Sequence, residues 1–104
     1  MKKHIIISGK VQGVGFRHWL YKAAMQRKID GWVKNKISGE VEALVIGNDT
    51  DINNLIKLCK KGSPLSKVTK IKVQNYPKEF LKKSFNIIVS HENKLKSKRL
   101  ISKD

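Results

Sequence analysis

The hydrophobic residues of this chain alternate between two spacings, and the order of that alternation restricts the fold more than any other feature. Five stretches are β-branched or alternate with a period of two, as strands do: 4–8, 32–36, 40–46, 68–75 and 85–89. Two stretches have helical spacing, the first carrying Phe16, Trp19, Leu20, Ala23 and Ala24, and the second Ile52, Leu55, Ile56 and Cys59. We expect the first helix to end near Lys28 and the second to stop at Gly62.

This order is β-α-β-β-α-β with an added final strand. It predicts an α+β, ferredoxin-like split β-α-β sandwich with two helices on one face of an antiparallel sheet. A chain of 104 residues is long enough for one hydrophobic core. We expect one domain over residues 1–90 and a basic, flexible tail over residues 91–104, where no hydrophobic period is evident.

Membrane and export segments are not evident in the sequence. No apolar run approaches the roughly 20 residues of a membrane-spanning helix. The apolar stretch Ile5-Ile6-Ile7 near the N-terminus is shorter than the roughly 7 to 15 residues of a signal peptide. The single cysteine, Cys59, occupies an expected core position, and no Cys/His cluster has the spacing of metal ligands. We therefore expect a cytoplasmic monomer without membrane contact, metal or cofactor.

The net charge of +15 is the one compositional extreme. Removing the five basic and two acidic side chains of residues 91–104 leaves a net charge of +12, so the basicity belongs to the predicted domain. Such a surface can attract small anions, a polyanion such as nucleic acid, or a membrane surface.

The loop between the first strand and the first helix carries three glycines, Gly9, Gly13 and Gly15. Such a loop can direct successive backbone N–H groups at an anion, and the N-terminus of the helix adds positive potential. Arg17, in the first helical turn, could bind phosphate oxygens through its guanidinium group. An ordinary glycine-rich connection with a surface arginine fits the same residues.

Asn35 lies at the end of the second predicted strand. In a split β-α-β fold the first two strands run parallel and end at the same edge, which brings Asn35 near the glycine-rich loop. An amide there could fix the position of a water molecule, although asparagine is also a common turn former.

Two motifs in this sequence resemble those of the acylphosphatase family. Gly9-Lys10-Val11-Gln12-Gly13-Val14-Gly15-Phe16-Arg17 is similar to its phosphate-binding signature, and Gly31-Trp32-Val33-Lys34-Asn35 followed by Gly39-Glu40-Val41-Glu42 is similar to its second signature. The resemblance covers about residues 3 to 90. The sequence departs from the family pattern at Lys36, which follows Asn35, and at Ser38, which precedes the turn glycine Gly39.

The resemblance implies a hydrolase that splits acyl phosphates into a carboxylate and inorganic phosphate. It implies that Arg17 and the backbone N–H groups of Gln12, Gly13, Val14, Gly15, Phe16 and Arg17 bind the phosphoryl group. It further implies that Asn35 orients the attacking water without metal or covalent intermediate. Inorganic phosphate and other anions should then act as competitive inhibitors.

Two other functions are compatible with the same sequence. RNA-recognition domains share the expected architecture, and the high charge would suit a polyanion. Their strands one and three carry exposed aromatic residues, however, and the corresponding strands here carry none, so only nonspecific nucleic-acid binding is expected. A phosphate-binding domain without turnover is the second alternative, against which the presence of both Arg17 and Asn35 argues.

Overall fold

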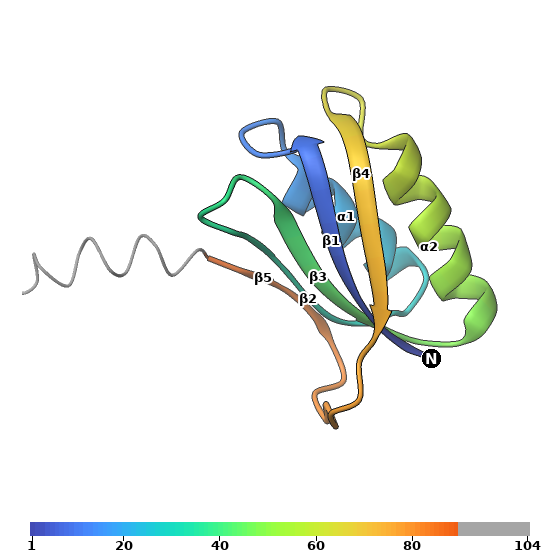
Figure 1. Cartoon of the computed structure of the whole chain (residues 1–104). Coiled ribbons are helices and arrows are strands. Elements are labelled where there is room, and N and C mark those ends of the chain that lie inside the picture. Colours follow the sequence, from blue (N-terminus) through green and yellow to red (C-terminus); the bar gives the residue numbers. More distant parts are fainter. Residues whose placement is uncertain (90–104) are drawn as a thin grey trace, which may run out of the picture.

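The computed structural model describes residues 1–89 as a five-stranded sheet with both helices packed on one face (Figure 1). The strand order is β4-β1-β3-β2-β5. The elements follow one another as β1 (Lys2–Lys10), α1 (Phe16–Gln26), β2 (Asp30–Asn35), β3 (Val41–Ile46), α2 (Asp49–Lys61), β4 (Lys67–Asn75) and β5 (Phe85–Ile88). The expected ferredoxin-like order is confirmed, whereas the tail expected over residues 91–104 lies outside the described residues.

The sheet is mixed, which corrects the expectation of an antiparallel sheet. β5 pairs parallel to β2, with Phe85 opposite Gly31 and Ile87 opposite Val33. β5 runs parallel to β2 because of where the chain leaves β4. The last residues of β4 lie on the side of the sheet where β2 begins. The connection over residues 76–84 passes along that side, and β5 then enters the far edge in the same direction as β2 (Figure 1).

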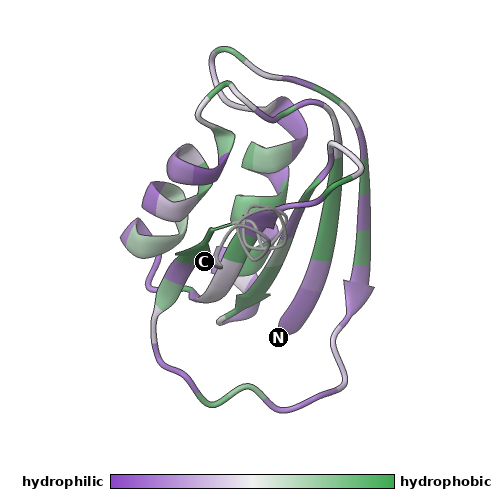
Figure 2. Ribbon diagram, turned by 90° about the vertical axis from the view of Figure 1, so that its left-hand side faces the viewer, coloured by the Kyte–Doolittle hydropathy of each residue, from purple (hydrophilic) through white to green (hydrophobic). Residues whose placement is uncertain are grey.

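The hydrophobic core lies between the helices and one face of the sheet (Figure 2). The inward positions of both helices are buried as their spacing predicted, while Trp19 and Ile56 are half-buried at the margin of the core. The sheet contributes alternate residues, which are Ile5, Ile7, Val33, Val41, Ala43 and Val45. Cys59 is fully buried, as expected of a core position.

Several element ends differ from the expected positions by one or two residues. α1 ends at Gln26 rather than near Lys28, because Lys28 has a positive φ of 55° that a helix cannot continue. The N–H group of Ile29 donates to the carbonyl of Ala24 and closes that end of the helix. β1 extends to Lys2 and Lys10, beyond the apolar run that indicated it, since backbone pairing with β3 and β4 continues there.

Neither helix within residues 1–89 covers the other face of the sheet. This face carries Trp32 and Lys34 of β2 beside His4 and Glu42, and the ammonium group of Lys34 lies 5.3 Å from the centre of the Trp32 ring. Trp32 therefore packs on the open face of the sheet, and no aromatic residue of β1 or β3 accompanies it apart from His4. Within residues 1–89, neither helix is long and apolar enough to cross a membrane.

β1 and β2 run parallel, so the two motifs lie together where the C-terminal ends of these strands meet. β3 lies between these strands, and Ile7, Val41 and Asn35 stand opposite one another across the three. The loop that follows β1 therefore passes close to the end of β2, where Asn35 is located.

Candidate active site

The loop 11–15 joins the end of β1 to the start of α1 and is held by a buried residue on either side. Val11 and Phe16 are both 1 % exposed. Between them Gly13 and Gly15 have φ values of 74° and 78°, in the left-handed region that other residues rarely adopt. No backbone–backbone hydrogen bond between described residues uses the N–H groups of residues 12–16. These donors are therefore free to bind a ligand, and we refer to residues 11–16 as the cradle.

The N-termini of the two helices differ in whether they can bind an anion. α2 starts after Asn48, whose side chain accepts a hydrogen bond from Asp51 N–H, and its first turn contains two acids. α1 starts after Gly15, which provides no side-chain cap, and its first turn contains no acid. The N-terminus of α1 thus keeps its unpaired N–H donors and its positive end of the dipole, an arrangement that suits an anion.

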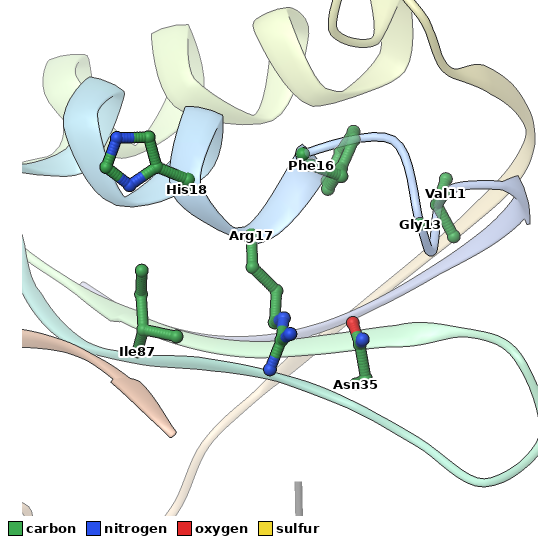
Figure 3. Close-up of a pocket in the computed structure, with 8 residues that line it drawn as sticks. Val11, Gly13, Phe16, Arg17, His18, Asn35 and Ile87 are labelled. Carbon is green, nitrogen blue, oxygen red and sulfur yellow. The ribbon is translucent and has the colours of Figure 1, made fainter. Parts of the chain in front are cut away.

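A cavity of about 210 Å³ opens between the cradle and the end of β2 (Figure 3). Arg17 extends from α1 towards the sheet, between Ile87 and Asn35. Its Nη1 lies 3.4 Å from the carbonyl oxygen of Ile88, a long contact that leaves the rest of the guanidinium group available. The residues that line the cavity are Val11, Gly13, Gly15, Phe16, Arg17, His18, Asn35 and Ile87.

Asn35 brings an unsatisfied acceptor to this cavity. Its Oδ1 is buried and has no hydrogen-bond partner, and in Figure 3 the amide points towards the cradle. Buried polar atoms are paired in the great majority of cases. An amide oxygen that is unpaired, next to a guanidinium group and free N–H donors, can accept a hydrogen bond from a water molecule held between them.

The structure brings together most of the residues that the sequence indicated. Gly13, Gly15, Phe16, Arg17 and Asn35 all line the cavity. The side chains of two others point elsewhere: that of Gln12 reaches the hairpin between β2 and β3, and that of Val14 packs against the core.

Val11, His18 and Ile87 also line the cavity but were not among the predicted site residues. For Ile87 the available signal was the alternation of Phe85 and Ile87, which places both on the core-facing side of β5. His18 is exposed beside Tyr21, with the two ring centres 6.1 Å apart. Across residues 1–89, no three His, Cys, Asp or Glu side chains gather as metal ligands would.

The family model for acylphosphatase matches residues 3–87, which is most of the chain. The chain belongs to the acylphosphatase family. It is 46 % identical over 69 residues to an acylphosphatase of Acidiphilium cryptum, a match that covers 66 % of this chain and 76 % of that one. It is 45 % identical over 73 residues to an acylphosphatase of Bacillus subtilis, covering 70 % and 80 % of the two chains.

A solved structure shows the same fold in this family. The crystal structure of acylphosphatase from Bacillus subtilis superposes with a TM-score of 0.80 at 40 % identity, covering 84 % of this chain and 97 % of that one. The ferredoxin-like architecture expected from the sequence is thus that of a related acylphosphatase. This chain is an acylphosphatase, an enzyme whose substrates are acyl phosphates.

Proposed function

We propose that in this acylphosphatase Arg17 and the backbone N–H groups of residues 12–17 bind the phosphoryl group, while Asn35 orients the attacking water. The observation that supports this most directly is the buried, unpaired Oδ1 of Asn35 in a cavity shared with Arg17. A water that donates to this oxygen keeps a lone pair free to face a phosphorus atom held by the cradle.

The proposed reaction is a displacement at phosphorus in a single step. The water oxygen forms a bond to phosphorus as the bond to the acyl oxygen breaks, and the carboxylate leaves with the electron pair. A proton of the water passes to a phosphoryl oxygen. Because a carboxylate is a weak base, its departure needs little help from an acid, and positioning with charge stabilisation provides most of the acceleration.

We also propose that the enzyme acts as a cytoplasmic monomer without a metal or other cofactor. Every group assigned above comes from a single chain, and the donors that face the phosphoryl group are a guanidinium group and backbone N–H groups. The site contacts the phosphoryl end of the substrate, and inorganic phosphate should therefore compete with it.

The roles of Arg17 and Asn35 can be tested by hydrolysis of benzoyl phosphate in the presence of a chelator. We expect Arg17→Ala and Asn35→Ala each to lower kcat/KM by about 10²- to 10³-fold, as removal of a transition-state donor does in other hydrolases. Arg17→Ala should also weaken inhibition by phosphate, whereas Asn35→Ala should leave it in place. Arg27→Ala and Asn53→Ala, which replace the same residue types outside the cavity, are the matched controls and should retain activity.

Three results would contradict the proposal. Added phosphate that leaves the apparent KM unchanged would exclude the cradle as the phosphoryl site. Activity lost on chelation would show a metal requirement. A folded protein that binds phosphate without hydrolysing benzoyl phosphate would be a binding domain, and its affinity for nucleic acid would then be the next measurement.

A further inference from the structure

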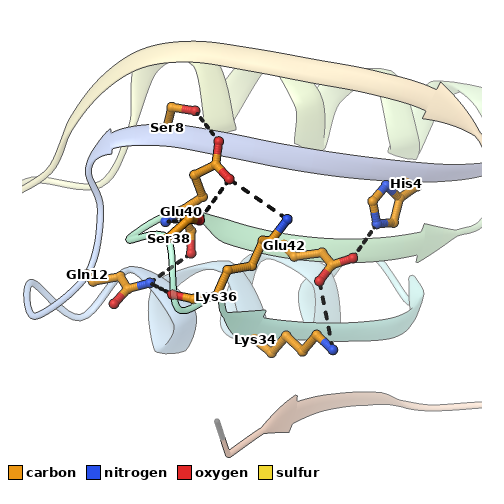
Figure 4. Close-up of polar contacts among 8 residues, drawn as sticks. All are labelled: His4, Ser8, Gln12, Lys34, Lys36, Ser38, Glu40 and Glu42. Carbon is orange, nitrogen blue, oxygen red and sulfur yellow. Dashed lines mark hydrogen bonds and ion pairs between the residues drawn. The ribbon is translucent and has the colours of Figure 1, made fainter. Parts of the chain in front are cut away.

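The side chain of Gln12 points away from the cradle that its backbone helps to form. Its Nε2 donates two hydrogen bonds, to the carbonyl oxygens of Lys36 and Glu40, each at 2.8 Å (Figure 4). A primary amide nitrogen carries two hydrogens, so its full donor capacity is used. The two bonds link segments that are 24 and 28 residues apart in the sequence.

The two acceptors close the hairpin between β2 and β3. Lys36 N–H donates to the Glu40 carbonyl at 2.8 Å, and Gly39 N–H donates to the Lys36 carbonyl at 3.1 Å. Each carbonyl oxygen has two lone pairs and can accept the additional bond from Gln12. Since Lys36 directly follows Asn35, the amide of Gln12 is fixed to the backbone one peptide unit beyond Asn35.

Besides the pairing of β1 with β3 and the bond from Ser8 Oγ to Glu40 just before the loop, the Gln12 side chain is the direct link from the loop to this hairpin. Within residues 1–89, the hydrogen bonds of Gln12 are the only ones that join residues 11–15 to the segment 35–40. The loop contains two left-handed glycines, whose backbones have wide conformational freedom. Buried Val11 and Phe16 hold the two ends of the loop, and the Gln12 bonds add a direct connection from the loop itself to the backbone beside Asn35.

We propose that the Gln12 side chain is a positioning residue, which holds the cradle and Asn35 at the separation that aligns the water with the bound phosphoryl group. This inference rests on the proposed function, because it assigns the water to Asn35. It separates two roles in one residue: the backbone N–H of Gln12 belongs to the binding loop, whereas its side chain acts through Asn35. Loss of the side-chain bonds should therefore lower kcat and leave phosphate binding largely intact.

The first test compares Gln12→Met, which has a similar length without donors, with Gln12→Glu, which has a similar shape but a carboxylate facing two carbonyls. In both variants we expect kcat for benzoyl phosphate to fall by about 10²-fold, because a displacement of the reacting groups by about 1 Å has an effect of this size. The inhibition constant of inorganic phosphate should change little. Ser38→Ala is the matched control, since it removes a bond of 2.9 Å to Glu40 within the same hairpin without touching the cradle, and it should retain kcat.

The second test is a double-mutant cycle with Asn35→Ala. If Gln12 acts through Asn35, then Gln12→Met should lower kcat in the wild-type background and cause no further loss in the Asn35→Ala background. An equal loss in both backgrounds would overturn the inference. So would a loss of phosphate affinity as large as the loss of kcat, or a variant with wild-type kcat.

A measurement without turnover separates this inference from the proposed function. Titration with inorganic phosphate, followed by the NMR signal of the Asn35 side-chain amide, should shift that signal in the wild type and shift it less in Gln12→Met. An inactive wild type would overturn the proposed function, while an identical shift in the two proteins would overturn the role of Gln12. Circular dichroism confirms folding, and failure of both Gln12 variants to fold would assign the bonds to stability rather than to positioning.

Discussion

Two buried polar atoms among the described residues lack a hydrogen-bond partner, and they differ in their surroundings. Asn35 Oδ1 lies in the cavity beside Arg17, whereas Ser63 Oγ follows α2 and is not part of that cavity. A buried group left unpaired costs about 1–3 kcal/mol of stability. The attacking water that we propose for the reaction would offer Asn35 Oδ1 a partner, while nothing in the structure explains the unpaired hydroxyl of Ser63.

The sequence indicated most of the residues that meet at the cavity, but it did not indicate the direction of each side chain. Arg17 and Asn35 were indicated by their positions beside a glycine-rich loop and at a strand end. Gln12 and Val14 belong to the same motif, yet their side chains point to the hairpin and to the core. Those directions depend on the left-handed glycines and on contacts with segments more than 20 residues away, which spacing along the chain does not encode.

Cys59 allows a prediction about thiol chemistry and alkaline pH. Burial raises the pKa of Cys59 to about 12 from its ordinary value of 9.0. The folded state holds the proton more tightly than the unfolded state, so this contribution to stability is complete below pH 9 and is lost as the pH rises towards 12. We expect the free energy of unfolding, measured with urea, to fall more steeply over that range in the wild type than in Cys59→Ala.

The control for this prediction is the reaction of the thiol below pH 9. A thiol reagent should modify Cys59 in the unfolded protein and not in the folded one, because a buried thiol is neither accessible nor ionised. Equal pH slopes for the two proteins, or rapid modification of the folded wild type, would contradict the prediction.

At the scale of elements, the pairing of β2 with β3 requires a glycine at position 31. Gly31 has a φ of 132°, and a Cβ atom there would lie 1.9 Å from the carbonyl oxygen of Leu44. Because that contact is with backbone, relief requires the strands to separate. We expect Gly31→Ala to lower the free energy of unfolding by about 3 kcal/mol or more, measured by urea denaturation.

Gly39 provides the matched control in the same hairpin. It also has a positive φ, 98°, but a Cβ atom added there meets nothing within 4 Å. Gly39→Ala should therefore cost only the backbone strain, about 1–2 kcal/mol. If Gly31→Ala lowers the free energy of unfolding no more than Gly39→Ala does, the close contact with Leu44 is relieved without loss of strand pairing.

The order of the elements was predictable because hydrophobic spacing is local, whereas the direction of β5 was not. A strand of four residues, Phe85–Ile88, can pair at either edge of a sheet in either direction. Its placement depends on where β4 ends and on the course of the connection over residues 76–84. That placement also determines that Ile87 lines the cavity, which is why the sequence did not indicate Ile87 as a site residue.

For the whole molecule, the net charge of +15 predicts a strong dependence of the reaction on ionic strength. The field of a basic protein raises the local concentration of an anionic substrate, and salt screens this field over about 10 Å at 0.1 M. We expect kcat/KM for benzoyl phosphate to fall by about tenfold as ionic strength rises from about 0.01 M to about 0.5 M.

A variant with fewer charges separates this general field from contacts within the site. Lys57, Lys60 and Lys61 are exposed on α2 and do not line the cavity. Replacing all three with glutamine lowers the net charge by three and should reduce the dependence of kcat/KM on salt. A reaction rate that is insensitive to salt in both proteins would contradict the prediction and confine the electrostatic effect to Arg17 and the cradle.

The unpaired oxygen of Asn35 has a consequence for attempts to engineer this enzyme. Since no described protein group donates to that acceptor, residues of similar size without a polar group could replace the asparagine without loss of a hydrogen bond within the protein, and selection for heat resistance alone would tolerate them. If Asn35 orients the water as proposed, a library screened only for survival at high temperature should accumulate substitutions at this position, with kcat/KM lowered by about 10²- to 10³-fold. Selection for thermal stability should therefore be combined with selection for activity at position 35.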